Sequence, residues 1–488
     1  MTGDLVVAVD CSTTAAKAVA VDAAGTVVAA ATRPLATATP AVGFHEQDAT
    51  AWYSATVGAV AEAVAALDDP ARVAAVCLTH QRESFVLLDR AGAPLRPAIL
   101  WVDSRAREEI AELGTPAVHA TSGKPPDTTP ALYKLAWLAR HEPDHVAAAA
   151  AVADVQGYLA LRLTGRLATS HASADTLGLF ALAELDWSPE LVALAGLRPD
   201  QLPALVAAGS PIADLTPEAA AALGLPGPVP LVAGIGDGQS AGLALGVAER
   251  GVAYLNLGTS MVCGVSCGEA LTSPAFRTLV GVRPGDYVLE TVLNAAAYLA
   301  SWAVREFGAG DLAAVQAAAA LLPPGAEGLL TLPYWNAAQT PYWDPAARGA
   351  VVGWHGRHTA AHLYRSVLEG VALELRLQLG ELERATGTPV ERLRAVGGGA
   401  RSPLWTQIVA DVTGREVAVM ADGEVSAAGA ALLGHVYLGH DGAALAWRSG
   451  HVVVPDRRAT AAYDGLYEPY RRLYPALKDV MALLAVRA

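Results

Sequence analysis

The chain has 488 residues, of which 53% are hydrophobic and 17% charged, so it can bury a large core and disorder is excluded as its main state. Asp and Glu number 48 against 34 Lys and Arg, which gives a formal charge of −14 at pH 7. This acidic balance argues against nucleic acid or an anionic membrane as a partner, because both attract clustered basic residues.

The cysteine content and the N-terminus indicate a reducing compartment. Four scattered cysteines are too few for a disulfide framework. The first residues carry neither a basic segment nor a cleavage-site pattern, and the alanine-rich run at 147–153 is far shorter than the ~20 residues of a membrane span. We therefore expect a soluble, cytoplasmic protein that does not contact a membrane.

The opening segment has the pattern of antiparallel strands followed by a helix. Residues 5–10 are apolar and β-branched, residues 18–22 are similar, and a turn precedes a third strand at 26–31. A helical pattern follows from 51 to 67. These elements predict the beginning of an α/β domain.

The middle of the chain continues with strands and then helices. Residues 73–78 and 85–89 have strand patterns on either side of 80–83, and helices are expected until about residue 208. A buried strand at 230–234 then leads into a glycine-rich turn and a helix of small residues.

The opening pattern recurs in the second half of the chain. Residues 252–257 and 261–266 are strand-like, and the hydroxyl-rich turn between them, residues 258–260, resembles the turn that follows Asp10. Such a repeat suggests two related α/β domains that face each other, with the site in the cleft between them. The boundary is expected near 246–251.

Asp10 stands at the end of the first strand, just before the hydroxyl residues Thr13 and Thr14. A carboxylate followed by such a turn suits a metal-bound phosphate, because N–H groups and hydroxyls can hold phosphate oxygens while the carboxylate holds the water shell of the metal. An ordinary capped hairpin turn would use the same residues. The similar turn at Gly258 and Thr259 in the second half of the chain favours the phosphate interpretation.

The glycine run 397–399 is a further candidate for ligand binding. Three glycines allow a ligand to approach the backbone closely. Ser402 and Pro403 suit the N-cap and the first position of the following helix, and a helix N-terminus attracts anions. A tight strand-to-helix turn without a ligand is the alternative.

Asp237 lies between glycines at the end of a buried strand, where its carboxylate would be exposed. A carboxylate so placed can take a proton from a substrate hydroxyl, and an Asx-turn is the structural alternative. Residues 238–242 also match the G-x-S-x-G pattern of serine hydrolases, with Ser240 as the nucleophile. Neither His435 nor His440 is marked by the sequence as its partner.

Together these segments resemble the FGGY carbohydrate kinases, a family of the actin-like ATPase superfamily. The resemblance extends over nearly the whole chain, and its segments are 10–17, 45–48, 80–89, 95–105, 123–137, 154–165, 234–246, 257–260, 368–370, 397–411 and 424–431. Within the family, residues 94–101 and 397–405 look most like xylulokinases.

The resemblance implies an α/β fold of two RNase H-like domains around a ligand cleft, an N-terminal sugar-binding domain at 1–246 and a C-terminal nucleotide-binding domain at 247–488. It also implies ATP and Mg²⁺ as cofactors and phosphorylation of a sugar or polyol hydroxyl. Asp237 matches the catalytic base of the family, and Asp10 matches its metal-associated aspartate. The positions that meet the nucleotide correspond to Thr13, Thr14, Lys17, Gly258, Thr259, Gly398, Gly399 and Arg401.

The expected sugar site consists of His80, Gln81, Arg82, Glu83, Trp101 and Asp103. D-xylulose is the expected ketose; Arg82 and Glu83 would hold its hydroxyls, and Trp101 would offer a stacking face. The Arg-Glu pair is more like glycerol kinases, yet Thr129 stands where those have a tyrosine, so a glycerol- or erythritol-type polyol stays open as the acceptor. Ser12 replaces the usual glycine of the first loop, which predicts a tighter turn.

The resemblance predicts direct in-line phosphoryl transfer, in which positioning and electrostatics carry most of the catalysis and domain closure excludes water. The rivals are a serine hydrolase that acts through Ser240 and a sugar sensor that has lost turnover. Retention of both Asp10 and Asp237 argues against the sensor. The sequence leaves a homodimer open.

Overall fold

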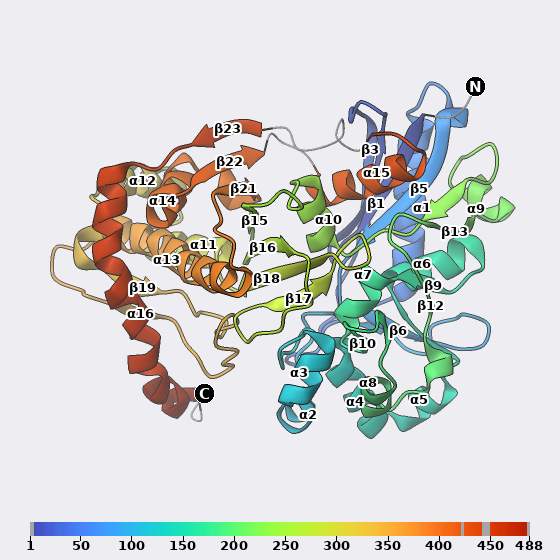
Figure 1. Ribbon diagram of the computed structural model, residues 1–488, viewed down its shortest axis with the longest axis horizontal. Coiled ribbons are helices and arrows are strands. Elements are labelled where there is room, and N and C mark those ends of the chain that lie inside the picture. The colour runs from blue at the N-terminus through green and yellow to red at the C-terminus, as the bar shows by residue number, and fades with distance from the viewer. Residues whose placement is uncertain (1–3, 421–423, 442–448, 486–488) are drawn as a thin grey trace.

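Two mixed β-sheets organise the molecule, one in the N-terminal half (residues 4–246) and one in the C-terminal half (residues 247–485) (Figure 1). The computed structural model describes residues 4–420, 424–441 and 449–485. The first sheet has the order β13 (Pro211–Asp214), β14 (Pro230–Val232), β5 (Val73–His80), β1 (Leu5–Cys11), β2 (Ala15–Val21) and β3 (Val27–Pro34). The second has the order β17 (Arg277–Val280), β18 (Tyr287–Leu293), β16 (Met261–Cys267), β15 (Val252–Leu257), β21 (Arg392–Val396), β22 (Glu416–Met420) and β23 (Ser449–Val453).

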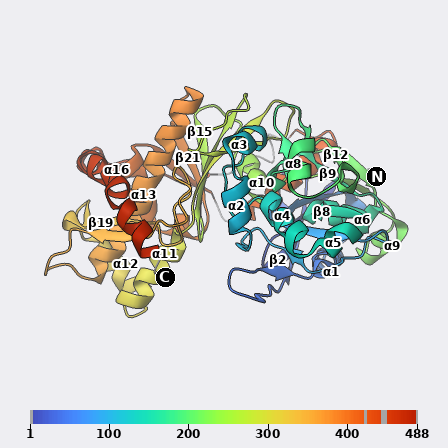
Figure 2. The same ribbon diagram turned by 90° about the horizontal axis from the view of Figure 1, so that it is seen from below.

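Helices cover the two sheets and fill the connections between their strands. Those of the N-terminal half are α1 (Ala49–Ala65), α2 (Arg107–Leu113), α3 (Pro116–Ser122), α4 (Ala131–His141), α5 (Pro143–Ala148), α6 (Val155–Thr164), α7 (His171–Ala174), α8 (Pro189–Leu194), α9 (Pro217–Ala222) and α10 (Asp237–Ala244). Those of the C-terminal half are α11 (Ala297–Phe307), α12 (Leu312–Ala320), α13 (Ala360–Thr386), α14 (Pro403–Thr413), α15 (Val425–Tyr437) and α16 (Arg457–Ala485). Seen from below, α13 and α16 lie at the opposite end of the molecule from α5 and α6 (Figure 2). Among the described residues, no helix combines the length and the apolar character of a membrane span.

The central strand β1 is apolar at nearly every position because both of its faces are buried. Leu5, Val7 and Val9 share one core with Trp52 of α1. The residues that alternate with them face the other side, where Val6 packs in a second core with residues of α15. A strand between two layers of helices needs a continuous apolar run, and the opening segment of the sequence supplies it.

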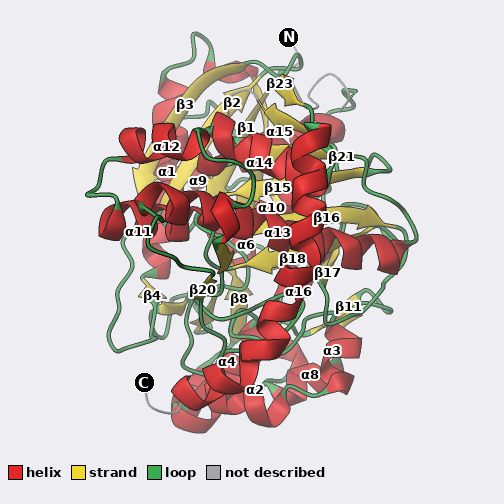
Figure 3. Cartoon of the chain, turned by 90° about the vertical axis from the view of Figure 1, so that its left-hand side faces the viewer, coloured by secondary structure: helices red, strands yellow, loops and turns green. Residues whose placement is uncertain are grey.

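The second sheet repeats the arrangement of the first. In each, the first strand pairs antiparallel with the next one through a short turn and parallel with a later strand: β1 with β2 and β5, and β15 with β16 and β21. Ala253, Leu255 and Leu257 of β15 face a core that includes residues of α13, α14 and α16, which lie together on that side of the sheet (Figure 3). The predicted pair of related α/β units is therefore confirmed.

Helix α15 lies between β22 and β23 of the second sheet in sequence but packs on the first sheet (Figure 1). Glycines allow this close approach: a Cβ on Gly434 would lie 2.5 Å from Val6 Cγ1, and a Cβ on Gly429 would lie 2.1 Å from the carbonyl oxygen of Ser240 in α10. The helices α10 and α15 thus lie against each other where the halves meet.

The segment up to residue 208 is less helical than predicted. It contains a four-stranded sheet of β4 (Glu46–Gln47), β7 (Ala98–Ile99), β6 (Phe85–Leu88) and β8 (Ala151–Asp154). Strand pairs are also formed by β9 (Ala168–Ser170) with β12 (Ala204–Val206), by β10 (Phe180–Ala181) with β11 (Asp186–Trp187) and, in the C-terminal half, by β19 (Leu330–Leu332) with β20 (Ala350–Val352). Alanine favours helices, but burial of β8 against β6 outweighs that preference.

Candidate active site

The turn after β1 is fixed by hydrogen bonds to the rest of the N-terminal half. Ser12 donates its N–H and its hydroxyl to the carbonyl of Ala15, at 3.0 and 2.8 Å. Thr13 Oγ1 donates to Gln81 Oε1 at 3.1 Å and accepts from the indole N–H of Trp101 at 2.9 Å. The φ of Ser12 is not positive, so serine stands in this turn without the strain that only glycine would avoid.

Asp10, next to the end of β1, is buried, and its Oδ1 has no hydrogen-bond partner. Burial and the charge of Asp237 raise the pKa of Asp10 to about 8. Lys17 stands opposite Asp10 on β2 and opposes that shift, while its ammonium forms an ion pair of 2.8 Å with Glu424. A buried carboxylate oxygen without a donor is suited to accept a cation.

Among the described residues, no group of three or more His, Cys, Asp or Glu side chains could enclose a metal ion. Mg²⁺ does not need such a cage, because it usually takes one or two carboxylates and completes its octahedral shell with water and phosphate oxygens. The unpartnered Oδ1 of Asp10 fits that mode of binding.

Asp237 is the first residue of α10 and its side chain is 37% exposed. Its Oδ1 accepts from the N–H of Gly238 at 2.8 Å and lies 3.4 Å from Nε of Arg82. The glycines beside it make room for this arginine: a Cβ on Gly236 would lie 2.4 Å from Arg82 Cγ, and a Cβ on Gly238 would lie 2.9 Å from Arg82 Nη2. The glycine-flanked aspartate of the sequence is thus a carboxylate placed against a guanidinium.

A buried cluster of opposite charges surrounds Arg82 and joins the two halves. Arg82 Nη1 donates to Glu290 Oε1 and Oε2 of β18, at 3.1 and 3.3 Å. Arg277 of β17 donates from Nη1 to Glu83 Oε1 at 3.2 Å and from Nε to Glu290 Oε1 at 2.6 Å. Tyr254 of β15 also donates to Glu290. Sequence reasoning missed Glu290 and Arg277, whose only signal is a charged residue within an otherwise apolar strand.

The remaining predicted sugar-site residues lie beside this cluster. His80 is buried, and its Nε2 bonds with Ser173 Oγ at 2.9 Å. Asp103 is also buried, and it accepts from the guanidinium of Arg105 at 2.9 Å to Oδ1 and 2.8 Å to Oδ2. Trp101 is partly exposed, and its N–H holds the first turn. These residues form one wall of the expected sugar site. His80 and Asp103 are buried within this wall, and Trp101 is partly exposed at its surface.

A lysine that the sequence did not single out supports the same wall. Lys134 of α4 is buried, and its ammonium donates to the carbonyls of Thr129, Thr128 and Trp101 at 2.7, 2.9 and 3.3 Å. Burial lowers its pKa to about 8, although nearby carboxylates oppose that shift. Lys134 thus ties Trp101 to the segment that precedes α4.

Asp127 forms a further contact between the halves. Gln339 Nε2 donates to Asp127 Oδ2 at 3.0 Å, and Thr129 Oγ1 donates to the same oxygen at 3.1 Å. Gln339 Oε1 is buried without a hydrogen-bond partner. An orphaned acceptor beside the predicted sugar wall can receive a ligand hydroxyl.

The two predicted nucleotide turns lie next to each other. Gly397 has a φ of 93°, and a Cβ on it would lie 2.6 Å from Asn256 Oδ1 and 2.7 Å from the carbonyl oxygen of Leu257. Glycine is therefore required where the glycine run meets the end of β15. The adjoining turn is held through its carbonyls, because Gly258 accepts from the N–H of Ala297 in α11 and Thr259 accepts from that of the N-cap residue Ala296, each at 3.0 Å.

The rest of the glycine run forms a short 3₁₀ turn before α14. Gly398 and Arg401 are exposed on it, whereas Gly399 is buried against Trp405. Ser402 caps α14 and Pro403 takes its first position, as predicted. The structure thus exposes Gly398 and Arg401 next to the turn that carries Gly258 and Thr259.

Ser240 is not presented as a nucleophile. It is fully buried in α10, and its hydroxyl donates to the carbonyl of Ser426 at 2.7 Å. His435 bonds instead with the carbonyl of Val21 and with His440, at 3.0 and 2.9 Å. The match to the serine hydrolase pattern is therefore a coincidence of small residues in a closely packed helix.

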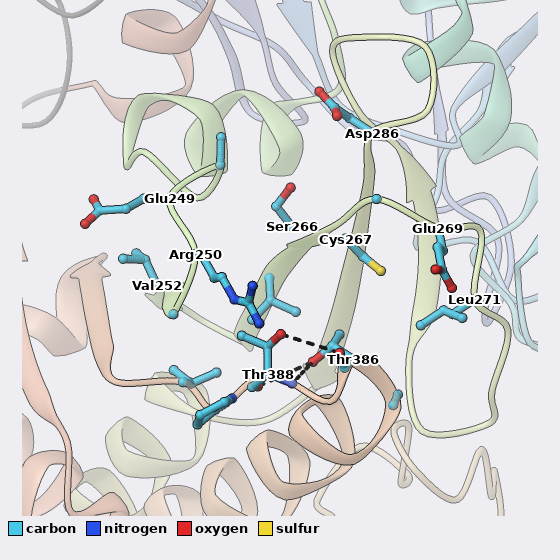
Figure 4. Close-up of a pocket in the computed structure, with 17 residues that line it drawn as sticks. Glu249, Arg250, Val252, Ser266, Cys267, Glu269, Leu271, Asp286, Thr386 and Thr388 are labelled. Atoms are coloured by element: carbon cyan, nitrogen blue, oxygen red, sulfur yellow. Dashed lines mark hydrogen bonds between the residues drawn. The ribbon is translucent and has the colours of Figure 1, made fainter.

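A polar cavity of about 470 Å³ lies in the C-terminal half, away from these groups (Figure 4). Its walls include Glu249, Arg250, Ser266 and Glu269, and they contain none of the residues predicted for the site. The site must therefore be sought where the two sheets meet and not in this cavity.

Family models establish the family that the sequence indicated only by resemblance. The N-terminal domain of the FGGY family of carbohydrate kinases matches residues 5–244, and the C-terminal domain matches residues 253–438. The chain belongs to the FGGY family of carbohydrate kinases. FGGY kinases use ATP as the phosphate donor, so this chain is a phosphotransferase that acts on an alcohol group of a carbohydrate.

Full-length relatives and solved structures agree with that assignment. The FGGY kinase is 32% identical to a xylulose kinase of Escherichia coli over 98% of this chain and 100% of that protein, and 33% identical to one of Klebsiella pneumoniae with the same coverage. A solved xylulose kinase from Rhodospirillum rubrum superimposes with a TM-score of 0.92 at 31% identity, over 98% of this chain and 99% of the other. The predicted fold of two actin-like ATPase domains is confirmed.

Proposed function

We propose that this FGGY kinase transfers the γ-phosphate of MgATP to D-xylulose. The observation that carries the proposal is its likeness, over 98% of its length, to two proteins described as xylulose kinases. The exposed Asp237 beside Arg82 adds the chemistry that such a transfer needs. The sugar is assigned to the domain of residues 1–246 and the nucleotide to the domain of residues 247–488.

In this proposal Asp237 accepts the proton of the attacking hydroxyl. General bases act within hydrogen-bond reach of the proton that they take, and an exposed carboxylate on the first turn of a helix can meet a ligand there. Arg82 and Glu83 hold neighbouring hydroxyls of the sugar. Trp101 offers a stacking face, and His80, Gln81 and Asp103 hold the wall behind it.

The nucleotide is held by the turns that follow the first strand of each sheet and by the glycine run. Thr13, Thr14 and Lys17 act from the N-terminal half, and Gly258, Thr259, Gly398, Gly399 and Arg401 act from the C-terminal half. Asp10 would hold Mg²⁺, which would supply positive charge to the phosphates as transfer proceeds. Phosphoryl transfer needs little covalent participation from the protein, so positioning of these groups carries the rate.

A polyol kinase is the second candidate, because one observation favours it. Arg82 and Glu83 stand where the chain resembles glycerol kinases, and a neighbouring cation and anion suit vicinal hydroxyls. A smaller acceptor would leave more of the wall around Trp101 without contacts.

A coupled assay of ADP release distinguishes these functions. The rate should be measured with D-xylulose, glycerol, erythritol and gluconate at saturating MgATP. A site that binds the extra hydroxyls of a ketose should prefer D-xylulose over glycerol by at least roughly 10²-fold in kcat/KM. Preference for glycerol or erythritol would show that the substrate is a polyol and not D-xylulose. Sugar binding without any ADP release would point to a sensor.

A further inference from the structure

Among the residues that the structure describes, Glu290 is the one group that hydrogen-bonds to both arginines of the buried cluster. It is fully buried in the middle of β18, directly opposite Arg277 of β17. Arg277 approaches its Oε1 through Nε, and Arg82 reaches both of its oxygens through Nη1. Tyr254 donates to it from β15. Side chains from three other segments of the chain therefore meet at this carboxylate.

Glu290 carries its negative charge at every pH at which the enzyme would work. Burial alone would raise its pKa, but Arg277, Arg82 and the hydroxyl of Tyr254 outweigh burial and hold the pKa at about 2. A permanently ionised partner in a dry site fixes a guanidinium strongly, because the charge-assisted bonds are not weakened by water.

The planar guanidinium of Arg82 connects this carboxylate to Asp237. Its Nη1 is bound to Glu290, while its Nε lies 3.4 Å from Asp237 Oδ1. Because the nitrogen atoms of a guanidinium form a rigid fork, an anchor at Nη1 sets the direction of Nε. Glu290 belongs to the C-terminal half, whereas Arg82 and Asp237 belong to the N-terminal half.

We propose that Glu290 is a positioning residue for phosphoryl transfer, which holds Arg82 in place against Asp237 and thereby aligns the base from the opposite half of the molecule. This inference rests on the proposed function of Asp237. Without Glu290, the charge of Arg82 would be shared only with Glu83 and Asp237, and the guanidinium would close onto the carboxylate that must accept the proton. Alignment of the base thus depends on the position of the C-terminal half.

Charged groups on several elements face Arg82 and Asp237 and must stay constant when Glu290 is changed. They are Asp10 of β1, which acts on Asp237, and Glu83, Asp175, Tyr254 and Arg277, which surround Arg82 and Glu290. A substitution at Glu290 alone leaves all of these groups in place. Its effect on kcat therefore reports on Arg82 and Asp237.

The test compares Glu290→Gln with the matched control Glu369→Gln. Glu369 is a second buried glutamate of the C-terminal half that binds an arginine and a tyrosine, through Arg365 Nε and Tyr463 Oη, each at 2.8 Å. Both variants should lower the melting temperature. Only Glu290→Gln should also lower kcat for D-xylulose by roughly 10- to 100-fold at little change in the KM for ATP, as expected for a misplaced base.

The split between kcat and the KM for ATP gives a readout that loss of stability alone would not change. Glu290→Gln keeps the size of the side chain but removes the charge that holds Nη1 of Arg82, so kcat should fall while the KM for ATP changes little. Glu290→Asp keeps the charge but withdraws it by one methylene, so its kcat should fall as well. If Glu290→Gln does not fold, the kcat of Glu290→Asp tests the positioning role of Glu290.

The inference is overturned if Glu290→Gln keeps the kcat of the wild type, as Glu369→Gln should, or if Glu290→Asp keeps kcat within about twofold. Absence of ADP release by the wild-type enzyme with every sugar would instead overturn the proposed function. The two failures are therefore distinguishable.

Discussion

Arg82 Nε lies 3.4 Å from Asp237 Oδ1, so the cation that follows β5 faces the carboxylate that begins α10. The N–H of Gly238 binds the same oxygen, at 2.8 Å. Both contacts thus engage Oδ1, and Oδ2 is the oxygen that we assign to the proton of the substrate.

Replacement of Asp237 by Asn should remove the base and keep the shape of the site. General-base catalysis contributes on the order of 10²–10⁴-fold, so Asp237→Asn should lower kcat for the sugar by at least roughly 10². Binding of ATP, measured by calorimetry, should change little. Ser240→Ala is a control on the same helix, and its kcat should stay near that of the wild type. A near-normal kcat in Asp237→Asn would disprove the assignment.

Replacement of Arg82 by Ala should separate sugar binding from nucleotide binding. Loss of a charged donor to a sugar hydroxyl costs about 1.5–3 kcal/mol, so the KM for sugar should rise at least about tenfold. The KM for ATP should stay within about twofold, because Arg82 binds Glu290 and Asp237 and not the nucleotide turns. Steady-state kinetics with either substrate varied provide the measurement. A larger rise in the KM for ATP would place Arg82 at the nucleotide.

Asp10 should make the stability of the enzyme without ligands depend on pH. The folded chain raises the pKa of Asp10 from 3.8 to about 8, so the protonated form is favoured and stability is lost as pH rises through that interval. Asp10→Asn cannot ionise, and its melting temperature should rise relative to wild type between pH 5 and about pH 8. A difference in melting temperature between the two proteins that stays constant over this pH range would contradict the raised pKa of Asp10.

Bound Mg²⁺ and ATP should reverse this effect and raise the melting temperature of the wild type more than that of Asp10→Asn. A cation that neutralises Asp10 should stabilise the wild type more than Asp10→Asn at pH 8, when both are melted with MgATP and with ATP plus EDTA. Equal stabilisation in both proteins would remove Asp10 from the metal site.

Lys134 should influence sugar binding through Trp101. Lys134→Met keeps the length of the side chain but removes the donor from three carbonyls, of which that of Thr129 is buried and costs about 1–3 kcal/mol when unpaired. The melting temperature should fall, and the KM for sugar should rise more than the KM for ATP. Equal changes in the two KM values would show that Lys134 supports the fold and not the wall.

Local patterns predicted the first strand of each large sheet well. The strand predicted at 252–257 is β15 with the same bounds, and the strand predicted at 5–10 is β1 with one more residue. The caps of α14 were also predicted, because Ser402 and Pro403 act through nearest neighbours. Such features depend on residues a few positions apart, which a sequence displays directly.

The charged cluster could not be predicted in the same way. Arg82 and Glu290 are separated by 208 positions, and only the packing of β17 and β18 against the N-terminal half brings them together. The sequence showed Arg82 and Glu83 as free ligands for hydroxyls, whereas the structure gives each an ionic partner from the C-terminal half. The site therefore depends on both halves, and a pattern within one of them does not reveal this.

The most direct test of the account follows the phosphate itself. ATP labelled in the γ-phosphate should be mixed with D-xylulose and an excess of enzyme, and the label in sugar and in inorganic phosphate should be measured over a single turnover. We expect the wild type to place the label on the sugar and Asp237→Asn to do so at least roughly 10²-fold more slowly. Label that appears only as inorganic phosphate, or equal transfer rates in the two proteins, would contradict a sugar kinase that uses Asp237 as its base.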